Sequence, residues 1–451
     1  MLERKIDNRL RAWKAKPNKN CLLVRGARQV GKTFSVEKFC RENYENYVYI
    51  NFDRDDAYKL IFDGNLDVDE LVLQISLRIK GARLVPGRTV LFLDEIQNCP
   101  RARTALKFLS IDGRFDVIAS GSLLGINYKE VPSFPVGYVD HLEMHGLDFE
   151  EFCWANGVPK EALLKIKGYF DAKEAVPNGV HVRMMELFKW HIVVGGMPAA
   201  VSAFVNTRNF AAVLELQKGI LRDYLDDIAK YAEGSEKAKA RACFLSIPKN
   251  LAKDHKKFQY SVVQKGGSAR KFGGSLMWLY DAGIINFCHN LSAPELPLEG
   301  NSKSDEFKVY TRDTGLLMAM LEDGAQKDII DGNLGIYKGA IYENIIADIF
   351  TKLGVKLYYF ERPSRIEVDF IVRRNGVATA VEVKSASNTK SKSMDTAIRN
   401  YGVRRGVKLS AQNVGASGLV ERWPLYMAIF LNGEPLGSRV KSGTEPNLTR
   451  A

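Results

Sequence analysis

The chain of 451 residues carries a formal net charge of +12 and has a hydrophobic content of 46%. This length predicts two to four domains with full-sized cores, and the basic balance favours an acidic partner. No apolar run of about 18 residues is present, and the start, Met-Leu-Glu-Arg-Lys, lacks the apolar centre of a signal peptide, so we expect a cytoplasmic protein without a membrane span. The six cysteines are scattered without a Cys-x-x-Cys pair, so we expect buried thiols rather than a zinc knuckle or a disulfide framework.

The N-terminal segment repeats apolar residues at helical spacing among basic residues. These apolar residues are Leu2, Ile6, Leu10 and Trp13. The spacing predicts an amphipathic helix that packs on the domain following it.

A glycine-rich loop follows the apolar run of residues 21–24 and precedes a helix predicted for residues 34–41. Its residues are Gly26, Ala27, Arg28, Gln29, Val30, Gly31, Lys32 and Thr33. The pattern of Gly, four residues and Gly-Lys-Thr lets backbone N–H groups wrap phosphates, because glycine permits dihedrals and close approaches that a side chain blocks. We therefore expect a nucleoside triphosphate here, with Lys32 at the outer phosphates and Thr33 as a ligand of the accompanying Mg²⁺.

A second strand is predicted at residues 47–52, and a strongly apolar third strand at residues 89–93 ends in Asp94 and Glu95. Such a strand is typical of a buried parallel sheet whose carboxyl edge opens on a ligand site. Asp94 is placed to hold the Mg²⁺ through water, and Glu95 to polarise the attacking water. The alternative is that both acids cap the following helix.

The next strand is predicted at residues 115–119 and ends in small polar residues. The hydroxyl of Ser120 is positioned to sense the terminal phosphate. Further on, His141 and His145 stand four residues apart, a spacing found in metal sites on helices, but no third ligand accompanies them. We interpret both as ordinary polar residues.

Four segments resemble prokaryotic ATPases of the AAA+ superfamily, close to its STAND-like members, that carry a C-terminal domain of unknown function. They are Leu93–Gln97, Ala119–Ser122, Leu147–Phe152 and Val194–Pro198. The resemblance implies an ATPase core with a helical lid ending near residues 223–231, and ATP with Mg²⁺ as cofactors. Relatives carry Gly-Arg where this chain has Gly137-Tyr138, so that arginine is absent here.

Residues 235–275 hold ten Lys and Arg against Glu236 and Asp254, a surplus of eight positive charges. The order of predicted elements is helix, glycine-rich turn, helix and strand, which looks like a winged helix. Such a module can place a basic helix in the major groove of double-stranded nucleic acid, where lysines neutralise phosphates. The alternative, a solvated basic face on a packing or regulatory module, is equally open.

The C-terminal part is predicted to contain a core helix at residues 339–354 and then a hairpin centred on Asn375-Gly376. In this register Phe370 lies opposite Val381, and the same register continued places Val368 opposite Val383, Asp369 opposite Glu382 and Glu367 opposite Lys384. Like charges facing each other in a sheet are unfavourable by roughly 0.2–1 kcal/mol. The pair of acids therefore calls for a cation, and a divalent metal is the natural candidate.

Asp369 followed after thirteen residues by Glu382-Val383-Lys384 resembles the core of PD-(D/E)xK nucleases, as do the preceding helix with Glu343 and the following Tyr401. Val368 stands where the named motif has proline. The resemblance implies that Glu343, Asp369 and Glu382 bind Mg²⁺ and that Lys384 stabilises charge on the phosphate. The alternative is a nuclease fold retained for packing or for nucleic-acid binding.

Together these patterns predict an α/β protein with a parallel-sheet P-loop AAA+ core, a helical lid, a winged helix and a restriction-endonuclease-like domain. The expected boundaries are residues 1–146, 147–232, 233–325 and 326–451. The expected function is ATP binding and hydrolysis whose nucleotide state controls the C-terminal module, and oligomerisation is left open. The competing hypothesis is a non-catalytic, nucleotide-gated protein-interaction switch.

Overall fold

The protein is described from a computed structural model. The structure describes residues 2–123, 137–231, 236–253, 255–333, 337–362, 366–384 and 392–431. The chain forms two compact units, each built from segments far apart in sequence. The first unit comprises Met1–Leu163, Lys189–Asn286 and Val309–Tyr337, and the second comprises Leu164–Phe188, Phe287–Lys308 and Lys338–Ala451. The four domain boundaries expected from the sequence stay predictions.

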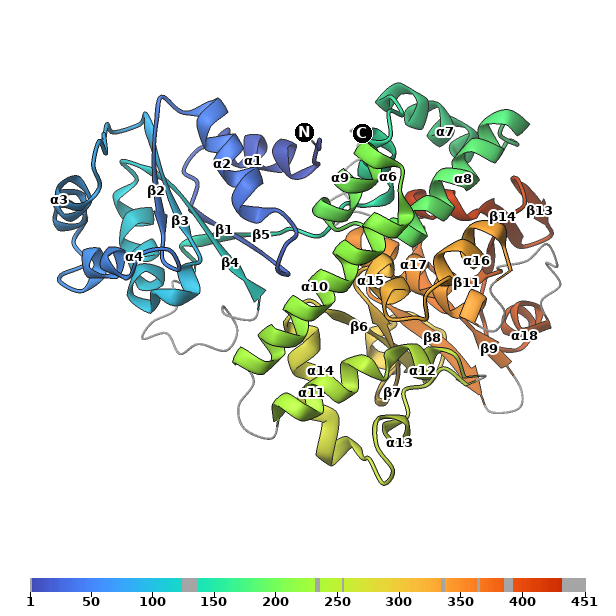
Figure 1. The fold of residues 1–451 in the computed structure, drawn as a ribbon. Coiled ribbons are helices and arrows are strands. Elements are labelled where there is room, and N and C mark those ends of the chain that lie inside the picture. The colour runs from blue at the N-terminus through green and yellow to red at the C-terminus, as the bar shows by residue number, and fades with distance from the viewer. Residues whose placement is uncertain are drawn as a thin grey trace, which may run out of the picture. The chain divides into compact units, whose positions relative to one another are not determined.

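The first unit contains a five-stranded sheet in the order β2-β3-β4-β1-β5 (Figure 1). Its strands are β1 Cys21–Gly26, β2 Asn46–Asn51, β3 Thr89–Asp94, β4 Asp116–Ser122 and β5 Val139–Glu143. All neighbouring strands are parallel, as predicted for a P-loop core. The carboxyl ends of β1, β3 and β4 therefore meet at one edge of the sheet, and this edge carries the glycine-rich loop, Asp94 and Ser120.

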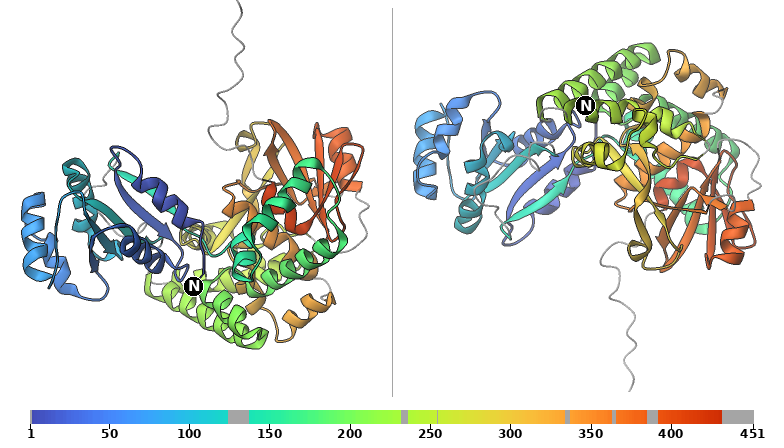
Figure 2. Two further views of the ribbon diagram at one scale, coloured as in Figure 1. Left: turned by 90° about the horizontal axis from the view of Figure 1, so that it is seen from above. Right: turned by 90° about the horizontal axis from the view of Figure 1, so that it is seen from below.

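Helices cover both faces of this sheet (Figure 2). They are α1 Ile6–Lys14, α2 Lys32–Asn43, α3 Val68–Arg78 and α4 Pro100–Asp112, with short helices at Asp56–Phe62 and Ile96–Asn98. One core joins the α3 and α4 side chains to Leu23 and Leu93, and the other joins the α1 and α2 side chains to Leu22 and Phe92. Because successive strand residues point to opposite faces, both faces of β1 and β3 need apolar residues. This explains the continuous apolar runs, and the predicted N-terminal helix is confirmed as a packing helix.

The rest of the first unit is mostly helical. Its helices are α6 Phe149–Ala155, α9 Pro198–Thr207, α10 Phe210–Tyr231, α11 Glu236–Leu245, α12 Ile247–Leu251, α13 Tyr260–Val263, α14 Ala269–Asp281, α15 Thr314–Ala319 and α16 Ala325–Asp331, while α7 Lys160–Ala172 and α8 Asn178–Val194 cross from one unit to the other. The strands β6 Ile285–Leu291 and β7 Ser302–Thr311 follow α14 and also cross between the units. Most of their residues belong to the second unit, where they form a four-stranded sheet of order β7-β6-β8-β9. This order of helices and strands follows the predicted one, and the winged-helix fold itself stays a prediction.

The second unit contains a sheet in the order β10-β11-β12-β14-β13. Its elements are α17 Tyr337–Lys352, β8 Tyr358–Arg362, β9 Ile366–Val368, β10 Phe370–Arg374, β11 Val377–Val383, α18 Lys392–Asn400, β12 Arg405–Ser410, β13 Gly415–Ser417, β14 Val420–Pro424 and a short helix at Leu425–Phe430. The pair β10 and β11 is antiparallel, whereas β11-β12 and β12-β14 are parallel. The sheet is therefore mixed.

The predicted hairpin register holds from Phe370 opposite Val381 to Arg374 opposite Val377. Asn375 and Gly376 both have positive φ, of 50° and 76°, as a two-residue turn between twisted strands requires.

The continuation of this register beyond Phe370 is wrong. Asp369 interrupts the strand, and its carboxylate accepts the Val383 N–H at 2.8 Å, so a side-chain bond replaces the next backbone bond of the ladder. The preceding residues pair with β8 instead, Val368 with Phe360 and Glu367 with Glu361. Val368 and Glu367 therefore do not continue the ladder opposite Val383 and Lys384.

All six cysteines are free thiols and buried, which confirms that expectation. Within the described ranges, no helix combines the length and the apolarity needed to cross a lipid bilayer.

Candidate nucleotide site

The glycine-rich loop connects β1 to α2, so the free N–H groups at the start of that helix lie beside the loop. Gly31 has a φ of 92° and Gln29 a φ of 61°, both in the left-handed region. At Gly26 an added Cβ atom would lie 2.1 Å from the carbonyl oxygen of Met144. A side chain is therefore excluded at Gly26 and strained at Gly31, which explains why the pattern needs glycine at both positions.

Lys32 is buried at the start of α2, with only 7% of its surface exposed. Its ammonium group donates hydrogen bonds to the carbonyl oxygens of Gly26 at 3.2 Å and Ala27 at 2.8 Å. Burial lowers the pKa of Lys32 to about 8, although Glu95 and Asp94 oppose this change. Both hydrogen-bond acceptors are neutral, so an anion within reach would stabilise the charged lysine.

Asp94, at the end of β3, is almost completely buried and gathers donors from several strands. Its Oδ2 atom accepts hydrogen bonds from the Thr33 hydroxyl at 3.0 Å, the Tyr49 hydroxyl at 2.9 Å and the Asn51 amide at 3.1 Å. Its Oδ1 atom accepts hydrogen bonds from the Ser120 hydroxyl and from the Glu95 backbone N–H. The sheet thus brings Thr33, Asp94 and Ser120 together as predicted from their positions.

Tyr49 and Asn51 were missed by the sequence analysis. Asn51 is paired in register with Asp94 across β2 and β3, which accounts for the contact. The available signal was a polar residue at the carboxyl end of the strand predicted at residues 47–52.

The side-chain oxygen atoms of Thr33 and Asp94 fit a Mg²⁺ ion. Adjacent ligands of an octahedral Mg²⁺ with bonds of about 2.1 Å lie about 3 Å apart. The Thr33 Oγ1 and Asp94 Oδ2 atoms are 3.0 Å apart, and both are oxygen atoms of the kind that Mg²⁺ prefers. The spacing fits direct ligation by both residues, whereas the sequence predicted that Asp94 holds the ion through water.

Glu95 has a φ of 54°, which is uncommon for a residue other than glycine and turns the chain sharply after β3. The Gln97 amide donates a hydrogen bond to the Glu95 carboxylate. Glu95 stands at the N-cap position of the short helix Ile96–Asn98, but its side chain makes no capping hydrogen bond there. The helix-cap alternative for Glu95 therefore finds no support in the described structure.

The loop opens on a cavity of about 570 Å³, a volume within the range of small-molecule sites. Lys32, Thr33 and Glu95 line it. Further lining residues are Asp53, Asn98, Phe34, Arg28, Gln29, Gly31, Asp223, Asp226 and Asp227. The site predicted from the glycine-rich loop therefore borders a space large enough for a nucleotide.

Helix α10 contacts the loop through the acidic stretch near its end. Asp227 pairs with Arg28 at 2.9 Å, and Asp223 accepts a hydrogen bond from the Gln29 amide at 2.6 Å. The Tyr224 hydroxyl donates to the Arg28 carbonyl oxygen at 3.0 Å. The sequence marked this stretch as the end of a lid but did not indicate that its acids touch the phosphate-binding loop.

In the second unit, two of the acids that were predicted to bind a metal ion lie beside lysines. Lys384 pairs with Glu382 at 2.5 Å. Glu343 lies 3.8 Å from the ammonium of Lys308, a fully buried residue of β7. Among the residues that the structure describes, no cluster of three or more His, Cys, Asp or Glu is arranged to hold a metal ion.

Lys308 also pairs with Glu367 at 2.8 Å, and its ammonium lies 4.8 Å from the centre of the Tyr359 ring. Burial alone would lower the pKa of Lys308, but Glu343, Glu367 and Asp369 more than offset this and raise the pKa above its usual value. A cation that balances Glu343 and Glu367 is thus supplied by the chain itself, and the metal site expected at Glu343, Asp369 and Glu382 stays a prediction. The sequence gave no signal for Lys308, because β7 precedes the hairpin by more than fifty residues.

The parallel sheet, the glycine-rich loop and the acidic end of β3 define a P-loop ATPase core. Residues 18–153 match a family model described as an AAA domain. The first unit therefore contains an AAA-type ATPase domain. Residues 185–327 and residues 338–424 match two models of domains of unknown function, DUF8612 and DUF4143. A search of curated proteins finds no match.

Several solved structures are similar at low identity. A Walker-type ATPase of Pyrococcus abyssi is 13% identical, with 71% of this chain and 96% of that chain covered at a TM-score of 0.42. The Aeropyrum pernix ORC1 protein in complex with DNA is 14% identical, with 73% and 92% covered at 0.31. AMPPCP-bound DnaA from Aquifex aeolicus is 10% identical, with 61% and 86% covered at 0.29.

Proposed function

We propose that the first unit binds ATP with Mg²⁺ at the glycine-rich loop and hydrolyses it. The proposal rests mainly on the surroundings of Lys32. This buried cation donates its hydrogen bonds to neutral carbonyl groups, and it lies at the edge of a cavity of about 570 Å³. A triphosphate supplies the anion that this lysine needs.

Each residue of the site has a distinct role in this proposal. The loop N–H groups and Lys32 bind the phosphates, while Thr33 and Asp94 hold the Mg²⁺, which neutralises charge on the phosphoryl oxygens. Glu95 orients and polarises the attacking water. Ser120, whose hydroxyl donates to Asp94, fixes that carboxylate and is placed to respond to the terminal phosphate.

The test is calorimetric titration of Mg-ATP into the full chain and into Lys32→Ala. We expect binding by the parent and no measurable binding by the variant. Arg41→Ala is the matched control, because Arg41 is an exposed cation on the same helix that pairs with Glu37. Unchanged ATP affinity in Lys32→Ala would overturn the assignment of the site.

We infer further that the nucleotide state controls the contacts of α10. Asp227 and Asp223 hold Arg28 and Gln29, two side chains of the loop that cradles the phosphates. Phosphate groups entering the cavity compete with these carboxylates for the same donors. This competition is the physical step by which ATP would act on the helical part of the chain and, through it, on the C-terminal module.

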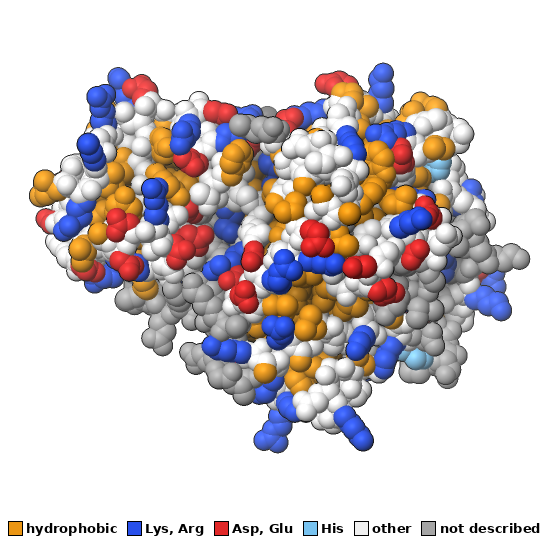
Figure 3. Space-filling model, viewed as in Figure 1, with side chains coloured by type: hydrophobic (Ala, Val, Ile, Leu, Met, Phe, Trp, Pro, Cys, Tyr) orange, Lys and Arg blue, Asp and Glu red, His pale blue; other side chains and the backbone are white. Residues whose placement is uncertain are grey.

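We propose that the activity controlled by the nucleotide state is the binding of double-stranded nucleic acid along residues 249–271. Lys249, Lys253, Lys265 and Lys271 are exposed there, and Figure 3 shows Lys and Arg side chains over α11 to α13 at the lower edge of the view. Binding driven by such lysines must weaken steeply as salt rises. A protein partner is the competing hypothesis, and it predicts no affinity for nucleic acid.

The test is the triple variant with Lys253, Lys256 and Lys257 changed to Glu. We expect weaker binding to all DNA sequences alike and a shallower dependence on salt. A control with the same change in charge replaces Lys80, Arg83 and Arg88, exposed residues of the sheet domain, by Glu. Equal DNA binding by both triple variants, or none by the parent, would favour the protein partner.

A further inference from the structure

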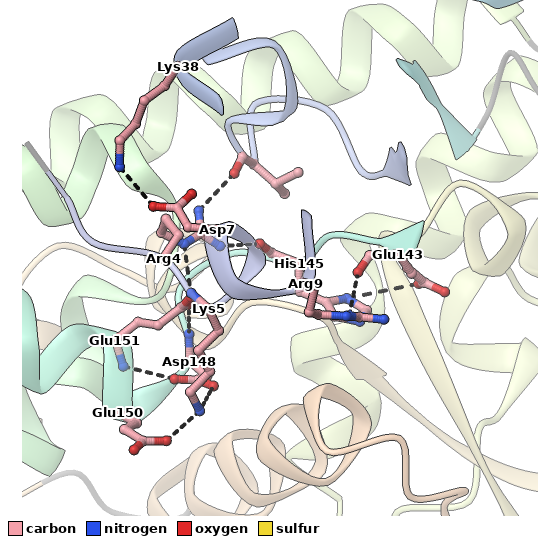
Figure 4. Close-up of polar contacts among 11 residues, drawn as sticks. Arg4, Lys5, Asp7, Arg9, Lys38, Glu143, His145, Asp148, Glu150 and Glu151 are labelled. Atoms are coloured by element: carbon pink, nitrogen blue, oxygen red, sulfur yellow. Dashed lines mark hydrogen bonds and ion pairs between the residues drawn. The ribbon is translucent and has the colours of Figure 1, made fainter. Parts of the chain in front are cut away.

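Arg4 lies just before α1 and is almost completely buried. Its Nη1 atom donates a hydrogen bond to the carbonyl oxygen of Val30 at 3.1 Å, and its Nη2 atom donates to the carbonyl oxygen of His145 at 2.7 Å. Its Nε atom lies 3.2 Å from the Glu151 carboxylate (Figure 4). Arg4 therefore ties the glycine-rich loop to the segment after β5 and to α6.

The contact with Val30 constrains the direction of a loop N–H group. In a trans peptide the carbonyl oxygen of Val30 and the N–H of Gly31 lie in one plane and point in opposite directions within it. A donor that holds this oxygen in place thus keeps the Gly31 N–H turned the other way. Gly31 has a φ of 92°, and glycine allows this peptide to rotate more easily than other residues do.

We infer that Arg4 is a positioning residue that fixes the Val30–Gly31 peptide of the loop in the orientation that binds phosphate. This inference rests on the proposed binding of ATP at the same loop. It adds a residue from the N-terminal segment, outside the glycine-rich pattern, to the machinery that recognises the triphosphate.

Several contacts hold Arg4 itself in place. Glu151, which pairs with it, is buried on α6 and also accepts the backbone N–H of Lys5 at 2.5 Å. Glu151 and Asp148 form a capping box at the start of α6. The Lys5 ammonium pairs with Asp148 at 2.6 Å and with Glu150 at 2.5 Å (Figure 4). Glu151 thus holds the Nε side of the guanidinium, while the Nη1 atom contacts the loop.

Anchoring of α1 does not by itself require the Val30 contact. Ile6, Leu10 and Trp13 bury the apolar face of α1 in the sheet core, and Lys38 of α2 pairs with Asp7 at 2.8 Å. A purely structural role for Arg4 predicts that its loss lowers stability and leaves phosphate affinity in the folded protein unchanged. The positioning role predicts a loss of affinity that does not follow stability.

The experiment compares Arg4→Met, Arg4→Lys and Glu151→Gln with the parent as full chains. The probes are Mg-tripolyphosphate, titrated by calorimetry, and the KM and kcat for Mg-ATP. Arg4→Met keeps the apolar stem without a donor, whereas Arg4→Lys can still donate to Val30. Glu151→Gln removes the partner charge of Arg4 but leaves its donation to the loop. Arg9→Met is the matched control, because Arg9 of α1 donates to the Glu143 carbonyl oxygen instead of the loop.

We expect Arg4→Met to weaken tripolyphosphate binding and to raise the KM for ATP by about tenfold or more, the loss of one charge-assisted hydrogen bond. Arg4→Lys should recover most of this loss. Glu151→Gln should lower the melting temperature with a smaller change in KM than Arg4→Met, and Arg9→Met should behave as the parent.

Parent-like tripolyphosphate affinity in folded Arg4→Met would overturn the positioning role. The proposed ATP binding would still stand in that case, because the parent binds tripolyphosphate. If Arg4→Met fails to fold, Arg4→Lys and Glu151→Gln still distinguish the positioning role from a structural one. A structural role predicts that the KM values of these two variants follow their melting temperatures. Absence of tripolyphosphate and ATP binding by the parent would overturn the proposed function itself.

Discussion

The two units each contain a buried lysine, and the two lysines are balanced in opposite ways. Lys32, in the first unit, donates to neutral carbonyl oxygens, and burial lowers its pKa to about 8. Lys308, in the second unit, pairs with Glu367 and Glu343, and these acids with Asp369 raise its pKa despite complete burial. The first lysine lacks a full countercharge, and the second has one.

This difference separates a ligand site from a closed internal pair. A buried charge is costly unless it is paired, so a site that keeps a lysine without a carboxylate contact gains stability when an anion binds. A lysine that is already surrounded by acids gains no comparable stability when an anion binds. The comparison therefore supports the proposed binding of ATP in the first unit, and it shows that the acids of the second unit already have a cation from the chain.

The largest effect is expected for Glu95→Gln. Loss of a general base reduces turnover by about 10²- to 10⁴-fold, while Lys32 should still bind ATP with nearly the parent affinity. Phosphate release and calorimetric binding measure the two quantities separately. Glu42→Gln, an exposed change on α2, is the control. Parent-like turnover by Glu95→Gln would place the base elsewhere.

The next effect concerns Lys308→Met. Removing one partner of a buried charge cluster leaves acids uncompensated and costs about 3–5 kcal/mol of stability. Because Lys308 supplies the cation, the parent should show no shift in melting temperature with Mn²⁺, whereas the variant should regain part of its loss when Mn²⁺ is added. Lys303→Met, at a partly exposed position of the same strand, is the control. A Mn²⁺-dependent rise in the melting temperature of the parent would instead support the predicted metal site at Asp369 and Glu382.

The lowered pKa of Lys32 predicts a pH dependence of ATP binding. Above about pH 8 the free lysine loses its proton, while phosphate groups stay fully ionised, so the association constant should fall by up to tenfold for each further pH unit. The stability of the nucleotide-free protein has the opposite sign. The folded pKa lies below the unfolded value of about 10.4, so the unfolded chain binds more protons and stability rises with pH between these two values. Titration calorimetry from pH 7 to pH 10 measures the binding slope, and a flat profile would contradict the assignment to Lys32.

A smaller effect is expected for Asp226→Asn. Asp226 lines the cavity from α10 and repels an incoming triphosphate, so its neutralisation should raise the affinity for Mg-ATP by a few-fold at low salt and less at high salt. Glu215→Gln is the matched control, since Glu215 is an exposed acid on the same helix. An unchanged or lower affinity in Asp226→Asn would mean that the acidic edge of α10 does not oppose ATP.

The sequence was most informative where function depends on neighbouring residues. The glycine-rich loop, the acidic end of β3 and the parallel strands were all predicted, because each is defined by a local pattern of dihedrals, charge or burial. The hairpin register was predicted up to Phe370. It failed at Asp369, where a side-chain hydrogen bond to Val383 replaced a backbone bond that pattern reasoning assumes.

The sequence was least informative where function depends on contacts between distant segments. Arg4 bonds Val30, Tyr224 bonds the Arg28 carbonyl, and Lys308 pairs with Glu367, yet no periodicity links these positions. Such contacts follow from how helices and strands pack, and one sequence does not record that packing.

The most direct test of the comparison exchanges the two lysines for methionine, one at a time, and follows thermal unfolding of the full chain with and without Mg-ATP. We expect Lys32→Met to melt no lower than the parent and to gain nothing from Mg-ATP, because a costly charge and the ligand site are lost together. Lys308→Met should melt lower and should keep the ATP-dependent gain of the parent. Equal losses of stability in both variants, or an ATP-dependent gain that survives in Lys32→Met, would contradict the account.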